Sequence, residues 1–123
     1  MASSKEVERK AIKLVMKKLH IVDIPPYKQA PADIHEKENQ KKRAEALKTE
    51  AEKLFENQMR GKVHLKVEYH RHKGRSDAAN IIGGIADALN KIAYVDDKQI
   101  VEIHYHEALG KVDEYWVEIE EVI

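Results

Sequence analysis

The hydrophobic period of this chain changes from two to about 3.6 residues within positions 62–92, which restricts it to layered folds. Over residues 62–70, apolar and polar side chains alternate, and this predicts a strand with one buried face. Residues 78–92 predict an amphipathic helix, with Ser76 or Asp77 as its N-cap. The side chains expected to face the core are Val63, Leu65, Val67 and Tyr69 in the strand, and Ile81, Ile82, Ile85, Ala88, Leu89 and Ile92 in the helix.

The remaining segments complete an α+β pattern. We expect a helix over 4–18, a short strand over 19–24 and a loop over 27–34. A long helix rich in strong helix formers should follow over 35–59. Two further strands are expected at 99–106, where Val101, Ile103 and Tyr105 share a face, and at 112–122, where Tyr115, Val117 and Ile119 point inward. The sequence thus predicts one domain over residues 1–123, with a small mixed or antiparallel sheet of about four strands and two to three helices.

The charges of this neutral chain are unevenly distributed along the sequence. The formal net charge is +0, there is no cysteine, and neither a membrane-spanning run nor a signal peptide is evident, so we expect a cytoplasmic protein. Residues 60–76 hold six basic side chains and one acid, whereas residues 96–123 hold nine acids and two lysines. Such segregation predicts a basic, DNA-facing surface, although solvated strand faces with no partner would produce the same pattern. The candidate DNA contacts are Lys62, Lys66, Arg71, Lys73, Arg75 and Lys91.

Acidic residues stand on both sides of the helix expected at 78–92. Asp77 precedes it and Asp96-Asp97 follows it, and we expect these carboxylates to converge. Aspartates suit Mg²⁺, which can polarise a phosphodiester and activate water. The alternative is that Asp77 only caps the helix and Asp96-Asp97 only forms a turn.

The same helix carries a polar face and a pair of glycines. Asn80, Gly84, Asp87 and Lys91 should lie opposite the isoleucines, with Asp87 and Lys91 spaced as a surface ion pair. Two adjacent glycines, Gly83 and Gly84, cost roughly 1 kcal/mol each in a helix. We therefore expect another backbone packed closely against them or, as the second choice, a ligand.

Histidines on the predicted strands raise the question of zinc. Five residues are candidates, namely His64, His70, His72, His104 and His106. Because the chain has no cysteine and no helix-borne ligand spacing, we favour exposed strand residues over a zinc site.

Several of these residues together resemble a known nuclease motif. The order and spacing of Asp77, Asn80, Asp87-Ala88-Leu89, Asp96-Asp97 and Gln99, after a basic strand and loop, are similar to those of the RusA family of Holliday-junction resolvases. The resemblance implies a RusA-like fold and a homodimeric, Mg²⁺-dependent endonuclease, of a type frequent in phages and prophages, that nicks branched DNA symmetrically. It implies Asp77 and Asp97 as metal ligands, with Asp96 and Asn80 as supporting catalytic residues.

The chain departs from the family pattern at four positions. Ala79 stands where the second acid of the motif belongs, and Gly83 where some members carry a lysine. Ala30 and Ala32 stand in a loop where many relatives have arginines. Two alternatives therefore remain open: a catalytically impaired relative that binds junctions without cutting them, and an unrelated module whose charged helices mediate assembly.

Overall fold

The protein forms a four-stranded mixed sheet with two helices packed on one of its faces, an α+β fold as the sequence predicts. The computed structural model describes residues 14–27 and 34–122. The strands are β1 (Leu14–Val22), β2 (Lys62–Arg71), β3 (Ile100–Leu109) and β4 (Glu114–Val122), and the helices are α2 (Ile34–Leu54) and α3 (Ala78–Leu89), with a short 3-10 helix, η1 (Asp97–Gln99), before β3. No helix among these residues is long and apolar enough to cross a membrane.

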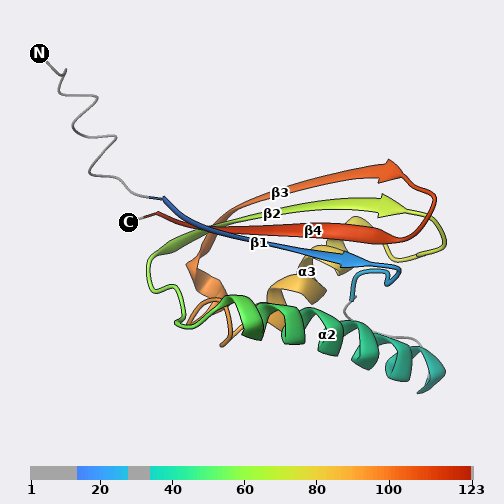
Figure 1. Cartoon of the computed structure of the whole chain (residues 1–123), viewed down its shortest axis with the longest axis horizontal. Helices are drawn as coiled ribbons and strands as arrows, with labels where there is room; N and C mark the ends of the chain where they lie inside the picture. The colour runs from blue at the N-terminus through green and yellow to red at the C-terminus, as the bar shows by residue number, and fades with distance from the viewer. Residues whose placement is uncertain (1–13, 28–33, 123) are drawn as a thin grey trace, which may run out of the picture.

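The strand order is β1-β4-β2-β3, so the last strand of the chain lies in the middle of the sheet (Figure 1). β4 pairs antiparallel with both β1 and β2, whereas β3 pairs parallel with β2. A parallel pair requires a crossover, and α3 supplies it between β2 and β3. β1 and β3 are the two edges of the sheet.

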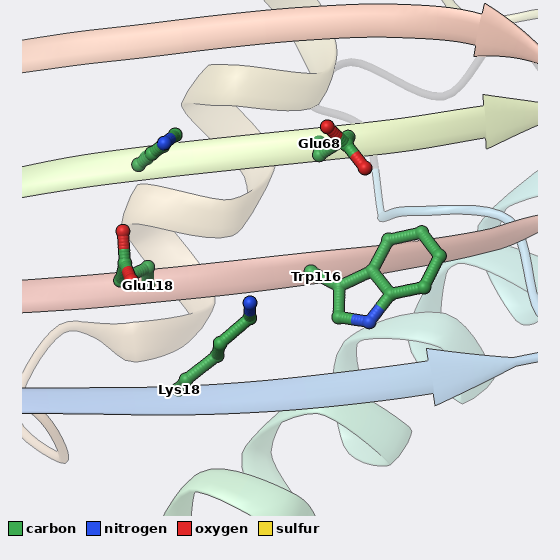
Figure 2. Close-up of a pocket in the computed structure, with 5 residues that line it drawn as sticks. Lys18, Glu68, Trp116 and Glu118 are labelled. Carbon is green, nitrogen blue, oxygen red and sulfur yellow. The ribbon is translucent and has the colours of Figure 1, made fainter.

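The core lies between the sheet and the helices. Alternate residues of β2 and β4 are fully buried, as predicted for the two central strands, and they contact the apolar stripe of α3. α2 adds Leu47, Ala51 and its neighbour Phe55 to the same cluster. The opposite face of the sheet has no helix over it among the described residues, as the two views in Figures 1 and 2 agree.

The expected helix over 4–18 is wrong for its described part, because Leu14–Val22 is a strand. Its apolar residues suited either structure, and pairing with β4 decides for the strand: Leu19 and Ile21 lie opposite Val117 and Tyr115 and are buried with them. Residues 4–13 and most of the loop expected over 27–34 lie outside the described residues.

Two helix ends and one strand differ from the sequence prediction. α2 ends at Leu54 rather than residue 59, because the buried Met59 instead pairs with the segment after α3, its amide donating to the Ala93 carbonyl over 2.8 Å. α3 ends at Leu89, two residues before Lys91 adopts a positive φ of 72°. Val101 and Ile103 of β3 share a side of the strand as expected, but they are 56% and 44% exposed.

Candidate active site

The helix α3 separates the two acidic positions that the sequence analysis expected to converge. Asp77 follows the end of β2, and Asp97 stands just before the start of β3. Because β2 and β3 are parallel, these two points lie at opposite ends of the sheet (Figure 1). The 12 residues of α3 alone span about 18 Å. One chain therefore does not bring Asp77 and Asp97 together.

Asp77 is the N-cap of α3. Its Oδ1 accepts a hydrogen bond from the backbone amide of Asn80 over 2.8 Å, and the Asn80 side-chain amide donates to Oδ2 over 3.4 Å. The capping interpretation is thus confirmed, and Asn80 contacts the carboxylate that it was expected to support. Asp77 and the following Ala78 and Ala79 are exposed. A cap that faces solvent keeps part of its carboxylate accessible to a ligand.

The loop before Asp77 is held by a buried carboxylate from another part of the chain. Asp113 accepts backbone hydrogen bonds from His72, Lys73 and Gly74 over 2.9, 2.9 and 3.1 Å, and a side-chain bond from Tyr69. Burial opposes ionisation of Asp113, but these four donors outweigh it and lower its pKa to about 2. The turn depends on Gly74, since a Cβ there would come within 2.1 Å of the Tyr69 hydroxyl oxygen.

Arg71 is a second anchor of this loop. Its guanidinium binds both Glu107 oxygens, with Nε and Nη2 at 2.8 and 2.7 Å, and also donates to the carbonyls of Gly74 and Ser76. The hydrogen bond from Arg71 lowers the pKa of the Glu107 carboxyl. Arg71 was expected to contact DNA, but in the structure its guanidinium N–H groups donate to Glu107 and to backbone carbonyls of the protein.

The other end of α3 is organised around η1. Asp96 is the N-cap of η1 and accepts a hydrogen bond from the Lys98 amide over 2.9 Å, which lowers the pKa of its carboxyl. The Gln99 side chain accepts from the Asp96 amide and donates to the carbonyls of Met59 and Gly61 over 2.9 and 2.8 Å. Two motif residues, Asp96 and Gln99, therefore have structural functions in the turn that carries Asp97.

Asp97 is exposed, and its charge and that of Asp87 both act on the buried Tyr94 hydroxyl. Burial raises the pKa of the Tyr94 hydroxyl, and the negative charges of Asp97 and Asp87 raise it further. Asp87, which the sequence predicts in an ion pair with Lys91, is therefore a second acid whose charge reaches Tyr94. Lys91 Nζ donates to the Val95 carbonyl over 2.7 Å.

Gly84 is explained by close packing, the first of the two expected reasons. A Cβ at this position would come within 2.3 Å of the Tyr27 carbonyl oxygen. Gly84 is also buried, so the prediction that it lies on the polar face of α3 is wrong. The glycine lets the segment at Tyr27 lie directly against the helix.

The six basic residues expected at DNA occupy three separate places. Lys62 and Lys66 project from the outer side of β2. Arg71, Lys73 and Arg75 lie at the end of β2 and in the loop that leads to Asp77, before α3. Lys91 follows the other end of α3, near Asp97. Lys66 pairs in register with Glu118 of β4 and lines a pocket with Lys18, Glu68 and Trp116 (Figure 2). Lys62 and Lys66 share the outer side of β2, whereas Lys73 and Arg75 lie in the loop beyond the end of that strand. Lys73 and Arg75 are exposed beside Asp77.

The histidines lie mostly on the outer face of the sheet, interleaved with glutamates. His64 contacts Glu102 at 3.1 Å, His104 contacts the same residue at 3.2 Å, and His70 contacts Glu68 at 3.1 Å. The described residues contain no group of three or more histidine, aspartate or glutamate side chains that could hold a metal ion. Within one chain, this finding applies to the expected Mg²⁺ site as well as to zinc.

Comparison with known protein families identifies the fold. Residues 6–120 of the 123-residue chain match the sequence model of the endodeoxyribonuclease RusA family. The protein belongs to the RusA endodeoxyribonuclease family. Membership implies a nuclease that resolves Holliday junctions, so its substrate class is branched DNA. No curated protein that was compared matches the chain.

Family membership excludes the alternative of an unrelated module that mediates assembly. The structure shows where two of the residues that depart from the family motif lie. Ala79 is exposed in the first turn of α3, two residues after Asp77. Gly83 is one turn further along the helix and is half-buried. Ala30 and Ala32 lie outside the described residues. The sequence did not predict that Asp113 holds the loop before Asp77, or that the charge of Asp87 acts on Tyr94. Both depend on contacts that the chain makes only when folded.

Proposed function

We propose that this protein is a Mg²⁺-dependent, structure-selective endodeoxyribonuclease that resolves Holliday junctions by paired symmetric nicks in DNA recombination and repair. The observation that carries the proposal is the family match over residues 6–120, together with the motif spacing of Asp77, Asp87 and Asp96-Asp97. We assign Asp77 and Asp97 as metal ligands and Asn80 and Asp96 as the residues that support them. Aspartate oxygens are the ligands that Mg²⁺ prefers.

The active species that we propose is a homodimer. Asp77 and Asp97 lie at opposite ends of α3 in one chain, so they can act at one site only if two chains contribute. A two-fold dimer would then hold two equivalent sites, each with Asp77 from one chain and Asp97 from its partner. Two symmetric sites match a substrate that must be nicked twice.

The exposed lysine and arginine of the loop before Asp77 supply the phosphate contacts in this proposal. Lys73 and Arg75 stand within four residues of Asp77, on a loop whose backbone Asp113 and Arg71 hold in place. Phosphate contacts of this kind position DNA without reading its sequence, and they weaken as salt increases. Lys62, Lys66 and Lys91 are weaker candidates because they lie away from this loop.

A complementation experiment tests the shared site. Asp77→Asn and Asp97→Asn are each expected to abolish cleavage of a labelled four-way junction in Mg²⁺. Mixed and reannealed, the two variants should form heterodimers with one intact site, and these should nick the junction once without resolving it. Failure of the parent protein to nick any junction in Mg²⁺ or Mn²⁺ would refute the enzyme; a mixture as inactive as its components would refute the shared site.

A second function, junction binding without cleavage, is favoured by one observation. Ala79 leaves the first turn of α3 with no acidic side chain. Ala79→Asp compared with the parent distinguishes the two functions: a large gain in nicking, with unchanged junction affinity, would identify a binding protein that lacks a ligand. Equal nicking by both proteins would show that the site does not need an acid there.

A further inference from the structure

The connection between β3 and β4 begins at the most exposed large apolar side chain among the described residues. Leu109, the last residue of β3, is 92% exposed, and Val112 within the connection is 38% exposed. Because the strand order is β1-β4-β2-β3, the connection, residues 110–113, crosses the end of β2 (Figure 1). Leu109 and Val112 therefore form an apolar tip at this end of the sheet.

The apolar tip is held against the end of β2. The Gly110 amide donates to the Arg71 carbonyl over 2.9 Å. A Cβ at Gly110 would come within 2.9 Å of the His70 Cβ, so the connection lies directly on β2. At its other end, the buried Asp113 binds the amides of the loop before Asp77. The protein thus presents the exposed leucine on a backbone that is fixed on both sides.

Arg71 connects the apolar tip with Asp77. Its guanidinium binds Glu107 and also donates over 2.8 Å to the carbonyl of Ser76, the residue before Asp77. Leu109 follows Glu107 by two residues, about 7 Å along β3, and alternation places both on the same side of the strand. The apolar tip and the exposed Asp77 carboxylate therefore stand at the same end of the sheet.

Basic side chains flank the apolar tip. Lys111 in the connection and Lys73 and Arg75 in the loop before Asp77 are all exposed. The neighbouring acids Glu107 and Asp113 accept hydrogen bonds from the protein itself. Cationic side chains hold DNA phosphates, and an apolar side chain between them can enter the space between bases. The combination suits a DNA surface better than a protein partner, which would have to bury these charges.

We infer that Leu109 enters the base stack at the branch point of the junction and so distinguishes branched DNA from linear duplex. The inference deepens the proposed function and rests on it. Inserting a leucine between base steps requires those bases to unstack. The cost is smallest where pairing and stacking are already interrupted, as they are where four arms exchange strands. A wedge of this kind favours a junction without reading its sequence.

Binding measurements in EDTA test the wedge separately from cleavage. Leu109→Ala should lower the affinity for a four-way junction about tenfold, because most of a buried leucine side chain is lost, and should leave the affinity for linear duplex within about twofold. Leu109→Phe keeps an apolar wedge and should bind the junction within about twofold of the parent. Met16→Ala removes a 53% exposed side chain from the other edge strand and, as the matched control, should change neither affinity.

A cross-link locates the side chain on the DNA. The chain has no cysteine, so Leu109→Cys and Met16→Cys each supply a single thiol. Each variant is mixed with junctions in which one base carries a tether that ends in an activated disulfide, either at the branch point or far along one arm. We expect Leu109→Cys to exchange with the branch-point tether at least about tenfold more efficiently than with the arm tether. Met16→Cys should show no preference.

Three results would overturn the inference. They are equal affinities of Leu109→Ala and the parent for the junction, equal weakening of junction and duplex binding by Leu109→Ala, and cross-linking of Leu109→Cys without preference for the branch point. A shift of the monomer–dimer equilibrium by Leu109→Ala in sedimentation equilibrium would overturn it as well, by placing Leu109 between subunits.

Nicking in Mg²⁺ judges the proposed function separately. A parent protein that never nicks, while Leu109→Cys cross-links at the branch point, would support the wedge and refute the nuclease alone. A parent that nicks, while Leu109→Ala binds the junction as well as the parent, would refute the wedge alone.

Discussion

The two ends of α3 carry similar acidic caps but are anchored by different chemistry. At one end, the loop before Asp77 is held by ionised groups, namely the Asp113 carboxylate and the Arg71–Glu107 pair. At the other end, the neutral side-chain amide of Gln99 holds the turn around Asp97 by donating to the backbone carbonyls of Met59 and Gly61. Both ends present an exposed aspartate. At the first end, charged groups tie the loop to distant strands, whereas at the second the Asp96 carboxylate caps η1 locally and the neutral Gln99 makes the distant contacts.

This difference indicates how the protein can keep exposed carboxylates in fixed positions. A buried carboxylate that accepts three amides holds a tight loop strongly, but only while it stays ionised. A neutral amide forms weaker bonds that do not depend on pH in the same range. The comparison predicts four effects, from the largest to the smallest.

The largest effect concerns the exposed acid itself. Asp77→Asn should reduce junction cleavage by about 100-fold or more, since losing even an outer partner of a metal site costs roughly 10- to 100-fold. Asparagine is as good an N-cap as aspartate, so the free energy of unfolding should change by less than about 0.5 kcal/mol. Cleavage assays and urea denaturation measure the two quantities. A loss of stability that parallels the loss of cleavage would show that Asp77 is only a cap.

The anchor of the Asp77 end should be the most important for stability. Asp113→Ala removes a buried acceptor of four hydrogen bonds and should lower the free energy of unfolding by about 3 kcal/mol. Asp97→Ala, an exposed substitution at the other end, serves as the control and should cost less than about 0.5 kcal/mol. Urea denaturation measures both, and hydrogen exchange should accelerate at the amides of residues 72–74 in the first variant only. Equal costs would contradict the proposed difference between the ends.

The charged anchor also predicts a pH dependence. The pKa of Asp113 is about 2 in the folded protein, below its ordinary value of 3.8, so its ionisation stabilises the fold above pH 4. This contribution, about 2 kcal/mol, is lost as the pH falls from about 4 to 2. Asp113→Asn should remove this part of the acid dependence of unfolding, whereas Gln99→Ala should leave it unchanged. An identical acid limb in the parent and Asp113→Asn would refute the role of the carboxylate charge.

The smallest effect concerns the neutral anchor. Gln99→Ala removes three hydrogen bonds of 2.8–2.9 Å and should lower the free energy of unfolding by about 1–2 kcal/mol. Because no ionised group is lost, the decrease should be the same at pH 4 and pH 7. A cost as large as that of Asp113→Ala would mean that the two ends are anchored equally strongly.

Much of the fold could be predicted because local pattern and tertiary environment agree. The alternation around Val67 and Val117 and the helical period around Ile85 match the observed elements, and all three side chains are fully buried. The first strand could not be predicted in this way. Residues 14–18 suit a helix or a strand, and their partner β4 lies about 100 residues away in the sequence.

The candidate site also has features that the local sequence predicts and features that depend on the tertiary structure. The sequence by itself indicated which acids to propose as metal ligands, because the spacing of Asp77 and Asp97 is a property of the chain. It also determined that Asp77 caps a helix, because capping is local. Only the tertiary structure decided where the two acids lie. The parallel pairing of β2 and β3 sends α3 back across the sheet and leaves the acids at opposite ends, and β4, inserted between β1 and β2, brings Asp113 beneath the loop that holds one of them.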